Sequence, residues 1–345
     1  MEKLSVKKFR YMNNFCTYPY VKNDNPFLKL MLNHLQDFGW TQKSIKFRTL
    51  HLLKFRNEVS VLWFHWPNSL WRNKIIILKY LSVLRFIYHV LLAKFLGYKL
   101  VWSVHNVMPH GEQDSTLEFF IRKFITKNFH LLIGHANNTY KALEEKKLIP
   151  QEYVLAVHGH YENEYDQKNL KITRKALNIS EEKYVILIKS GGKNFDSSLK
   201  FAKTFDSIEL KNIQLLVLGN KISDNVNVTF IPGFVKDEDL SSYISISDYV
   251  ALPYEEITTS GAYFLAITLE KPVIAKNLPF FREHGGDKSC LIFDDSEDLK
   301  EKLIKLEEGH FCFEKSNIIE VKNKYTWKNA SKQISESFNK LLLNS

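Results

Sequence analysis

The stretch KYVILIKSGGKNFDSSLKFAKTF (residues 183–205) decides the fold class. Residues 184–188 form a short run of large apolar side chains, which is typical of a strand covered on both faces of a sheet. A polar loop with two adjacent glycines follows, and residues 197–205 then carry apolar side chains at helical spacing. A strand, a loop and a helix in this order indicate one unit of a parallel α/β sheet.

The same alternation runs through the rest of the chain. Further strands are predicted at 59–64, 100–104, 131–134, 153–157, 213–218, 226–230, 249–252 and 272–275. Further helices are predicted at 29–38, 74–96, 117–128, 237–245, 260–269, 295–306 and 327–343. The polar stretch 162–171 has no periodicity, and we interpret it as a linker. The sequence therefore predicts two doubly wound, Rossmann-like α/β domains, with a ligand at the carboxyl ends of the strands in the cleft between them.

Length and composition agree with two globular domains. The chain has 345 residues, of which 45% are hydrophobic and 25% charged, and these values exclude disordered, collagenous and coiled-coil proteins. The three cysteines (Cys16, Cys290 and Cys312) are far apart, so we expect neither a disulfide framework nor a zinc ribbon. No apolar run follows the first residues, and we therefore expect no signal peptide and a cytoplasmic protein.

Positive charge is concentrated in the first part of the chain. Residues 1–100 contain 17 Lys and Arg against 4 Asp and Glu, a net charge of +13, whereas the remaining residues have a net charge of −3. A one-sided basic field points to a partner that carries phosphate, such as a nucleic acid, an anionic membrane or a pyrophosphate-linked substrate. The alternative is that the lysines serve solubility alone.

Two basic, aromatic-bearing segments favour contact with a membrane surface. Residues 75–96 are apolar, but Lys79, Arg85 and Lys94 interrupt them, so we expect no membrane-spanning segment. An amphipathic helix of this kind can lie in the headgroup plane, and residues 119–125 have the same chemistry. The alternative is a helix of the hydrophobic core with one solvent-exposed face. If these helices do dock, four basic residues are expected to contact an anionic membrane: Lys79, Arg85, Arg122 and Lys123.

Histidines follow the predicted strands of the first domain. Six of the 12 histidines stand there: His65, His105, His110, His135, His158 and His160. Six such residues predict a polar site that binds hydroxyls or phosphates, or that supplies a base. Metal ligation is the competing interpretation, but the spacing of a zinc site is missing, and we expect no metal.

The second domain offers two candidate phosphate-binding loops. Lys189, Gly191, Gly192 and Lys193 follow a strand; the glycines permit close backbone approach, and the lysines supply charge. This loop matches neither the Walker A nor the GxGxxG pattern. Residues 260–262 (Ser-Gly-Ala) open a helix, whose first N–H groups can bind an anion. The alternatives are an ordinary turn and an ordinary capped helix.

The ordered series of motifs resembles the bacterial GT-B glycosyltransferases of group 1, similar to family 4, of exopolysaccharide, capsule and O-antigen pathways. The first half carries the resemblance at NPF (25–27), VSVLWFHWP (59–67), LVWSVHNVMPH (100–110) and HGHY (158–161). The second half carries it at VTFIPGFVKDEDLSSYISISDYVALPY (228–254), SGAYFLAITLEKPVIAKNLPFFRE (260–283) and YTW (325–327). The resemblance implies an acceptor-binding domain at 1–165, a nucleotide-sugar-binding domain at 172–322 and a terminal helix, 323–345, that packs back on the N-terminal domain.

The resemblance also implies roles for individual residues. The donor diphosphate would be held by Lys189, Lys193, Gly191, Gly192 and the N–H groups of Ser260, Gly261 and Ala262. Phe234, in the turn 232–235, would border the nucleobase, and Tyr254 and Glu255 would complete the donor site. Glu255 or Glu256 would bind hydroxyls of the donor sugar, and His105 would face the reacting centre. The donor is a substrate, so no cofactor and no metal are implied.

The sequence departs from the family pattern in three ways. The paired glutamates of retaining members are replaced by Ile257 and Leu265, the Arg and Lys phosphate pair becomes Lys189 and Lys193, and no Gly-rich loop is evident near the N-terminus. Retention and inversion of the anomeric centre both stay open. An inverting enzyme needs a base, for which His105, His110 and Glu112 are candidates.

The function expected from this resemblance is transfer of a sugar from a UDP- or GDP-sugar to a lipid-linked glycan. The enzyme would be a hexosyltransferase of cell-surface polysaccharide synthesis, peripheral at the inner face of the cell membrane. One alternative is a non-catalytic nucleotide-sugar-binding partner of another transferase. The other is a nucleic-acid-binding protein, although no RRM, OB, helix-turn-helix or zinc signature is present, so no nucleic-acid partner is expected.

Overall fold

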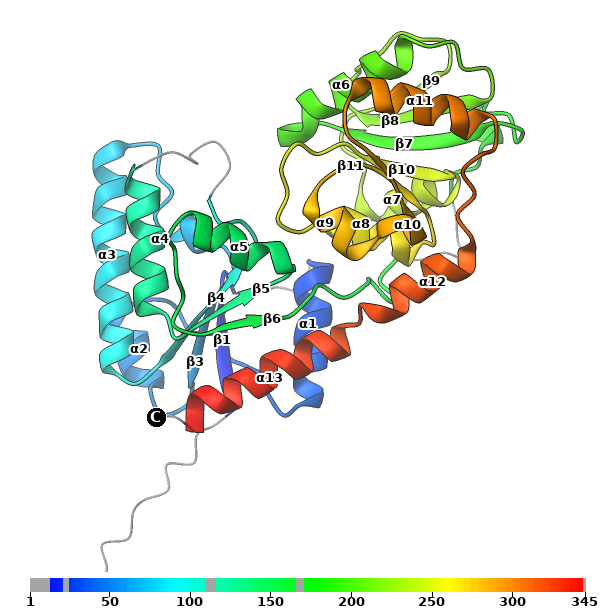
Figure 1. The fold of residues 1–345 in the computed structure, drawn as a ribbon. Helices are drawn as coiled ribbons and strands as arrows, with labels where there is room; N and C mark the ends of the chain where they lie inside the picture. The colour runs from blue at the N-terminus through cyan, green and yellow to red at the C-terminus, as the bar shows by residue number, and fades with distance from the viewer. Residues whose placement is uncertain (1–12, 21–24, 109–115, 166–170, 344–345) are drawn as a thin grey trace, which may run out of the picture. The chain divides into compact units, whose positions relative to one another are not determined.

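The computed structural model describes residues 13–20, 25–108, 116–165 and 171–343 (Figure 1). The chain divides into two compact units. Unit 1 comprises Met1–Val157 and Trp327–Ser345, and unit 2 comprises His158–Thr326. His110 and Glu112, two of the candidate bases, lie outside the described residues.

Unit 1 is a six-stranded parallel sheet with the order β2-β1-β3-β4-β5-β6. Its strands are β1 (Asn14–Tyr18), β2 (Thr41–Gln42), β3 (Val61–Phe64), β4 (Lys99–Val104), β5 (Leu131–Gly134) and β6 (Tyr153–Leu155). Its helical elements are α1 (Pro26–Asp37), α2 (Thr49–Phe55), η1 (Pro67–Leu70), α3 (Ile76–Phe95), α4 (Thr116–Asn128), α5 (Asn137–Glu145) and α13 (Trp327–Leu343). Strands β3 to β6 were predicted; β1 and β2 were not.

The two faces of this sheet carry different helices. On one face, alternate strand residues such as Leu62 and Phe64 pack with α2, α3 and α4 in one apolar core. On the other face, Phe338 of α13 contacts Phe15 and Trp63, with ring centroids 6.3 and 5.3 Å apart. The last helix, α13, also lies along α1, where the Ser331 hydroxyl donates a hydrogen bond to the Met31 carbonyl. The terminal helix therefore belongs to the N-terminal sheet.

Unit 2 is a second six-stranded parallel sheet, with the order β12-β11-β10-β7-β8-β9. Its strands are β7 (Tyr184–Ser190), β8 (Ile213–Gly219), β9 (Val228–Pro232), β10 (Tyr249–Leu252), β11 (Val273–Lys276) and β12 (Cys290–Phe293). Its longer helices are α6 (Phe195–Asp206), α7 (Asp237–Ser245), α8 (Gly261–Thr268), α11 (Ser296–Glu307) and α12 (Lys315–Lys324). Its shorter ones are η2 (Lys175–Leu177), η3 (Gly192–Asn194), α9 (Pro279–His284) and α10 (Gly286–Ser289).

The unit boundaries differ from the predicted 165, 172 and 322. The chain enters unit 2 at residue 158 because the segment 158–161 packs there: the His158 ring stacks on Phe264 at 4.6 Å, and the Tyr161 N–H donates to the Thr268 hydroxyl. It leaves unit 2 only after Thr326, since the Tyr325 ring packs on Phe264 at 5.6 Å. The polar stretch 162–171 is therefore not the point where the chain changes units.

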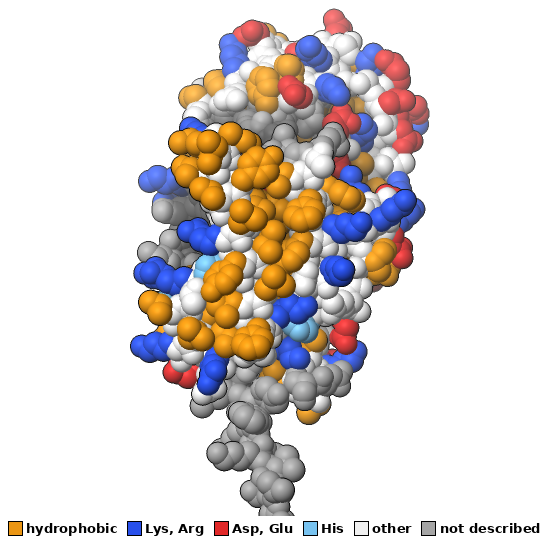
Figure 2. Space-filling view, turned by 90° about the vertical axis from the view of Figure 1, so that its left-hand side faces the viewer, with side chains coloured by type: hydrophobic (Ala, Val, Ile, Leu, Met, Phe, Trp, Pro, Cys, Tyr) orange, Lys and Arg blue, Asp and Glu red, His pale blue; other side chains and the backbone are white. Residues whose placement is uncertain are grey.

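Helix α3 buries one face and exposes the other. Val83, Phe86, Val90 and Ala93 belong to the core of unit 1. The remaining sides expose apolar residues, together with parts of α2 and α4 (Figure 2). We call this the α3 surface; it consists of Leu50, Leu53, Ile76, Ile77, Tyr80, Leu81, Leu84, Tyr88, Leu91, Phe119 and Phe120.

The prediction that no segment could span a membrane needs correction. The described residues include one helix, α3, that is long and apolar enough to do so by length and composition, with a mean hydropathy of 1.7 over 18 residues. One of its three charges, Lys94, lies in the last turn, so it interrupts the apolar stretch little. Only 28% of that stretch is buried inside the protein.

Candidate functional site

Three histidines meet at the carboxyl edge of the sheet in unit 1. His65, His105 and His135 follow β3, β4 and β5, which are neighbours in the sheet. Nδ1 of His65 lies 3.2 Å from Nε2 of His105, and the rings of His105 and His135 stack with their centroids 4.9 Å apart. The structure thus brings together three of the six histidines predicted to form a site, because parallel neighbouring strands end at the same edge.

Aromatic side chains enclose this cluster. The Trp66 indole stacks on His105, and Phe27 presents its edge to His105 with the ring centroids 5.2 Å apart. Phe27 stands at the start of α1, where the Asn25 side chain caps the helix by accepting a hydrogen bond from the Leu28 N–H. The motif NPF therefore has a structural role in placing an aromatic ring against the histidines.

Burial keeps two of the three histidines neutral. His135 is 1% exposed, and burial lowers its pKa to about 4; Nδ1–H donates to the Ala156 carbonyl, 2.8 Å away. Burial and the neighbouring His135 lower the pKa of His65 well below its usual value. The half-buried His105 is the cluster member that retains access to solvent. The role predicted for His105 at the reacting centre stays a prediction.

The other two histidines of the predicted group lie elsewhere. His158 and His160 belong to unit 2, where His158 stacks on Phe264 and the His160 N–H donates to the Tyr325 carbonyl. These contacts hold the segment 158–161 to unit 2. From the sequence, His158 and His160 were assigned to the end of a strand of the first domain, whereas they belong to unit 2.

The predicted donor residues of unit 2 gather at the carboxyl edge of its own sheet. Lys189 lies near the end of β7, and its Nζ is 5.9 Å from the centre of the Phe234 ring, which is 84% exposed beyond β9. An exposed aromatic ring beside a lysine provides a stacking surface next to a positive charge. Lys193 lies in η3, and its side chain is outside the described parts of the structure.

Glycines shape this edge. Gly191 and Gly192 have φ values of +154° and +55°, and a Cβ at Gly192 would have no atom within 4 Å. At Gly219, the end of β8, φ is +116° and a Cβ would lie 2.0 Å from the Ser190 carbonyl oxygen. The ends of β7 and β8 thus approach more closely than any side chain allows, while the backbone beside Gly192 stays open.

The start of α8 presents free N–H groups beside β10. Ser260 caps this eight-residue helix, and its hydroxyl accepts a hydrogen bond from the Tyr263 N–H. A Cβ at Gly261 would lie 2.7 Å from the Tyr161 hydroxyl oxygen, so a small residue is needed at this turn. Gly261 and Ala262 stand at the first positions of α8, where N–H groups have no partner within the helix.

Glu255 forms ion pairs with two lysines. Its carboxylate pairs with Lys200 at 2.9 Å and with Lys276, and these hydrogen bonds, that of Lys276 first, lower its pKa. The neighbouring Glu256 is exposed. Tyr254 is half-buried, and its ring stacks on Phe281 with the centroids 6.2 Å apart. The roles predicted for these three residues toward a donor sugar stay predictions.

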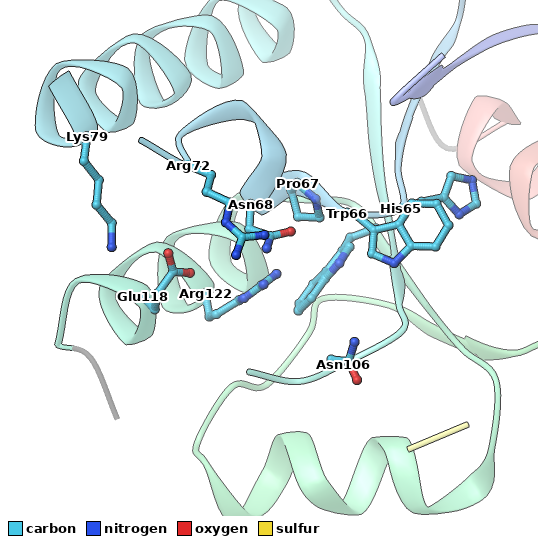
Figure 3. A pocket seen from close by; sticks show the side chains of 10 residues that line it. His65, Trp66, Pro67, Asn68, Arg72, Lys79, Asn106, Glu118 and Arg122 are labelled. Carbon is cyan, nitrogen blue, oxygen red and sulfur yellow. The ribbon is translucent and has the colours of Figure 1, made fainter. Parts of the chain in front are cut away.

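Unit 1 also has a basic cavity that the sequence did not predict. It has a volume of about 270 Å³ and adjoins the histidine cluster through His65 and Trp66 (Figure 3). Arg72, just after η1, and Arg122 of α4 line it. The sequence placed Arg122 on a membrane-facing surface, but this side chain is only 3% exposed and cannot contact a membrane. Among the described residues, no group of three or more His, Cys, Asp and Glu could hold a metal ion.

No family model matches the chain, and no curated protein matches its sequence. Solved structures do match its fold. Sucrose-phosphate synthase from Thermosynechococcus elongatus is 14% identical, with a TM-score of 0.65 and coverage of 96% of this chain and 99% of that chain. HepE from Anabaena, in complex with UDP and glucose, is 12% identical, with a TM-score of 0.67 and coverage of 95% and 99%.

A third structure is more distant. Trehalose 6-phosphate synthase from Burkholderia multivorans is 7% identical, with a TM-score of 0.60, and the match covers 86% of this chain and 74% of that chain. At these identities the likeness shows the fold alone. The predicted two-domain α/β fold of GT-B type is thereby confirmed.

Proposed function

We propose that this protein is a glycosyltransferase that moves a sugar from a UDP- or GDP-sugar to a lipid-linked glycan. The observation that carries the proposal is the edge of unit 2, where Lys189, the open glycine backbone and the start of α8 follow neighbouring strands of a GT-B sheet. HepE, of the same fold, was solved in complex with UDP and with UDP-glucose, which supports a UDP-sugar as the donor.

Each part of this edge has a chemical task in the proposal. The N–H groups of Gly261 and Ala262 and the positive end of the α8 dipole attract the donor diphosphate. Lys189 adds charge at the same edge, and the exposed Phe234 ring offers a stacking surface for the nucleobase. Because the diphosphate is the leaving group, fixed positive charge around it lowers the barrier to transfer. In this proposal lysine and N–H groups, not a metal, offset that charge, so activity should survive EDTA.

His105 is the proposed contact to the reacting sugar. It comes from the end of β4, and it is the half-buried member of its cluster. Nε2 of His105 and Nδ1 of His65 share one hydrogen bond, which fixes the ring. A fixed imidazole can take the proton of an acceptor hydroxyl in an inverting enzyme, or bind a sugar hydroxyl in a retaining one.

We propose that the protein acts at the inner face of a membrane. The α3 surface is apolar, and Figure 2 shows Lys and Arg side chains along its borders. An exposed patch of this composition is unusual for a protein that meets only water. Apolar insertion and attraction to anionic lipids together stabilise peripheral binding. The occupant we propose is therefore an anionic lipid surface, which would present a lipid-linked acceptor in the context of cell-surface polysaccharide synthesis.

The donor site is tested by thermal shift with UDP, GDP and their sugars, on the wild type and a Lys189→Ala variant. A ligand at about 100 times its dissociation constant stabilises a protein by about 2.7 kcal/mol. A shift that is selective for one nucleotide and reduced in the variant supports the donor site and identifies the base. No shift with any nucleotide contradicts it. Hydrolysis or transfer of the bound sugar then separates an enzyme from a non-catalytic binding partner.

A further inference from the structure

The cavity in unit 1 is built from four elements at the carboxyl edge of the sheet. Asn68 and Arg72 come from η1 and the residues after it, Lys79 from the first turn of α3, Arg122 from α4, and Asn106 from the segment after β4 (Figure 3). Trp66 stands between the cavity and His105, on which it stacks. The cavity therefore lies beside the histidine cluster of the proposed reacting centre.

Positive charge predominates in this cavity. Among the described residues that line it, Arg72, Lys79 and Arg122 are cations, and Glu118 is the one carboxylate. His65 is neutral at neutral pH, because burial lowers its pKa. Figure 3 shows the two guanidinium groups in the same space, and Lys79 extends from α3 on the side of Glu118. Like charges gathered at one place repel, unless an anion between them offsets the repulsion.

Arg122 carries the strongest evidence for an anion site. Its side chain is 3% exposed, and within the described structure Nε and Nη1 are buried without a hydrogen-bond partner. Its guanidinium lies over the Trp102 ring, 4.7 Å from the centre. Burial lowers the pKa of Arg122 to about 10, although the Glu118 charge opposes this change. A buried charge whose donors are unpaired is costly, so proteins retain one where a ligand pairs with it.

Glu118 does not complete the pairing of Arg122. One of its oxygens, Oε1, accepts a hydrogen bond from the Trp71 indole N–H at 2.7 Å. The carboxylate offsets one positive charge, and the cavity holds three. The planar forks of two arginines match the oxygens of a phosphoryl group, to which they can each donate two hydrogen bonds. The amides of Asn68 and Asn106 supply further donors at the rim.

We propose that this cavity binds a phosphoryl group of the acceptor, as a phosphate or a diphosphate. The inference rests on the proposed function and names the substrate class on the acceptor side. Bound there, the anion holds the acceptor beside Trp66 and His105, with the sugar end toward the histidine cluster. The phosphoryl group can belong to a lipid diphosphate or to a soluble phosphorylated sugar, and both present the same oxygens to Arg72 and Arg122.

Tryptophan fluorescence reports ligand binding at this cavity separately from binding at the donor site. All six tryptophans lie in unit 1 (Trp40, Trp63, Trp66, Trp71, Trp102 and Trp327), and two of them line the cavity. Inorganic pyrophosphate is the probe, added to the full chain. We expect a saturable change in emission for the wild type and for Lys189→Ala. In Arg72→Gln the dissociation constant should rise about 10- to 100-fold, the effect of losing a hydrogen bond between charged groups.

A second variant distinguishes a role of Arg122 in ligand binding from a purely structural role. Arg122→Met keeps much of the length of the side chain and removes the unpaired charge. If Arg122 serves ligand binding, the ligand-free Tm stays equal or rises, and the pyrophosphate response is lost. If Arg122 serves only to neutralise Glu118, the Tm falls, and Arg72→Gln binds pyrophosphate like the wild type. This second result overturns the proposal.

Farnesyl diphosphate distinguishes the two sources of the phosphoryl group. If farnesyl diphosphate binds at least tenfold more tightly than inorganic pyrophosphate, and Arg72→Gln abolishes this binding, the site is assigned to a lipid diphosphate. Equal affinity for the two probes assigns it to a soluble phosphorylated acceptor. Absence of any binding contradicts the site, whichever the source. UDP on the same samples separates this failure from a failure of the proposed function, because a UDP-induced thermal shift reports unit 2.

Discussion

The imidazole of His105 lies flat on the indole of Trp66, with the ring centroids 4.5 Å apart and the planes 16° from parallel. The same indole borders the basic cavity of Arg72 and Arg122. One aromatic ring therefore joins the proposed reacting centre to the proposed phosphoryl site. Trp66 and His105 directly follow β3 and β4, which are hydrogen-bonded neighbours, so the sheet brings the two rings together.

His105→Phe separates the chemical role of this residue from its packing role. Phenylalanine keeps the stacking on Trp66 but removes the nitrogen that contacts His65. We expect kcat/KM for sugar transfer to fall about 100-fold or more, as for loss of a group that transfers protons. The Tm of unit 1, measured by tryptophan fluorescence, should stay near that of the wild type. Full activity in this variant would exclude His105 from the chemistry.

The stability of unit 1 should depend on His135 below neutral pH. Its pKa is about 4 in the folded protein and about 6.5 in an unfolded chain, so between these values the unfolded state binds the extra proton. The contribution of His135 to the free energy of unfolding is therefore fully present above pH 6.5 and falls as the pH drops from 6.5 toward 4. Urea unfolding followed by tryptophan fluorescence measures this slope.

The matched variant for this prediction is His135→Gln, which does not titrate. It should reduce the pH slope of the unfolding free energy by about one proton, which is ~1.4 kcal/mol per pH unit. The variant is less stable than the wild type at about pH 7.5, because a flexible polar side chain replaces a buried ring, but the slope is the diagnostic quantity. An unchanged slope would show that His135 is not the group that titrates.

Two left-handed glycines of unit 2 should respond differently to alanine. At Gly219 the new Cβ meets the Ser190 carbonyl oxygen at 2.0 Å, and the φ of +116° adds strain, so we expect a loss of about 3 kcal/mol or more. At Gly192 the φ is +55° but no atom lies within 4 Å, so about 1 kcal/mol is expected. Urea unfolding followed by far-UV circular dichroism measures both. Equal losses at the two positions would argue against the close approach of β7 and β8.

Binding to vesicles should depend on the apolar side chains of the α3 surface. Leu81 and Leu84 are 56% and 63% exposed, so a Leu81→Ser/Leu84→Ser variant should fold normally. Flotation with anionic vesicles should decrease at least tenfold, since each leucine contributes about 1.5–3 kcal/mol when it is fully buried in an apolar phase.

The control for flotation is Val226→Ser, which removes an apolar side chain of unit 2 that is 94% exposed. This variant should float like the wild type. High salt should weaken binding of the wild type, because attraction between basic residues and anionic lipids is screened. Equal flotation of the leucine variant and the wild type would contradict the proposal that α3 enters the lipid surface.

The elements of the fold could largely be predicted, because strands buried on both faces read as continuous apolar runs. Residues 184–188 and 213–218 lie in β7 and β8 as predicted. Strand β1 (Asn14–Tyr18) was missed because the polar residues Asn14 and Thr17 interrupt its apolar run. Its Phe15 side chain becomes buried only when Trp63 and Phe338 pack beside it. Strand β12 (Cys290–Phe293) was also missed, although it is as long as the predicted strand β3: it follows the short helix α10 directly, so no loop in the sequence marks its start.

The sequence indicated which strand ends carry candidate site residues, but it did not indicate which of these side chains contact one another. The ends of β3, β4 and β5 were identified, yet His158 looks equivalent to His135 in the sequence, whereas its ring stacks on Phe264 of unit 2. Nothing in the sequence around Arg122 indicated that its side chain is buried. In a segment that is both basic and apolar, helical spacing leaves more than one face able to point inward.

The sequence by itself determined the alternation of strands and helices, the basic charge of the first 100 residues and the glycines at the strand ends, because these depend on local side-chain chemistry. Only the tertiary structure decided that α4 turns Arg122 into a cavity with Arg72, and that α3 leaves Leu81 and Leu84 exposed. The physical reason is that packing selects which face of a helix meets the sheet. That choice depends on the shapes of residues far away in the chain, which no local pattern contains.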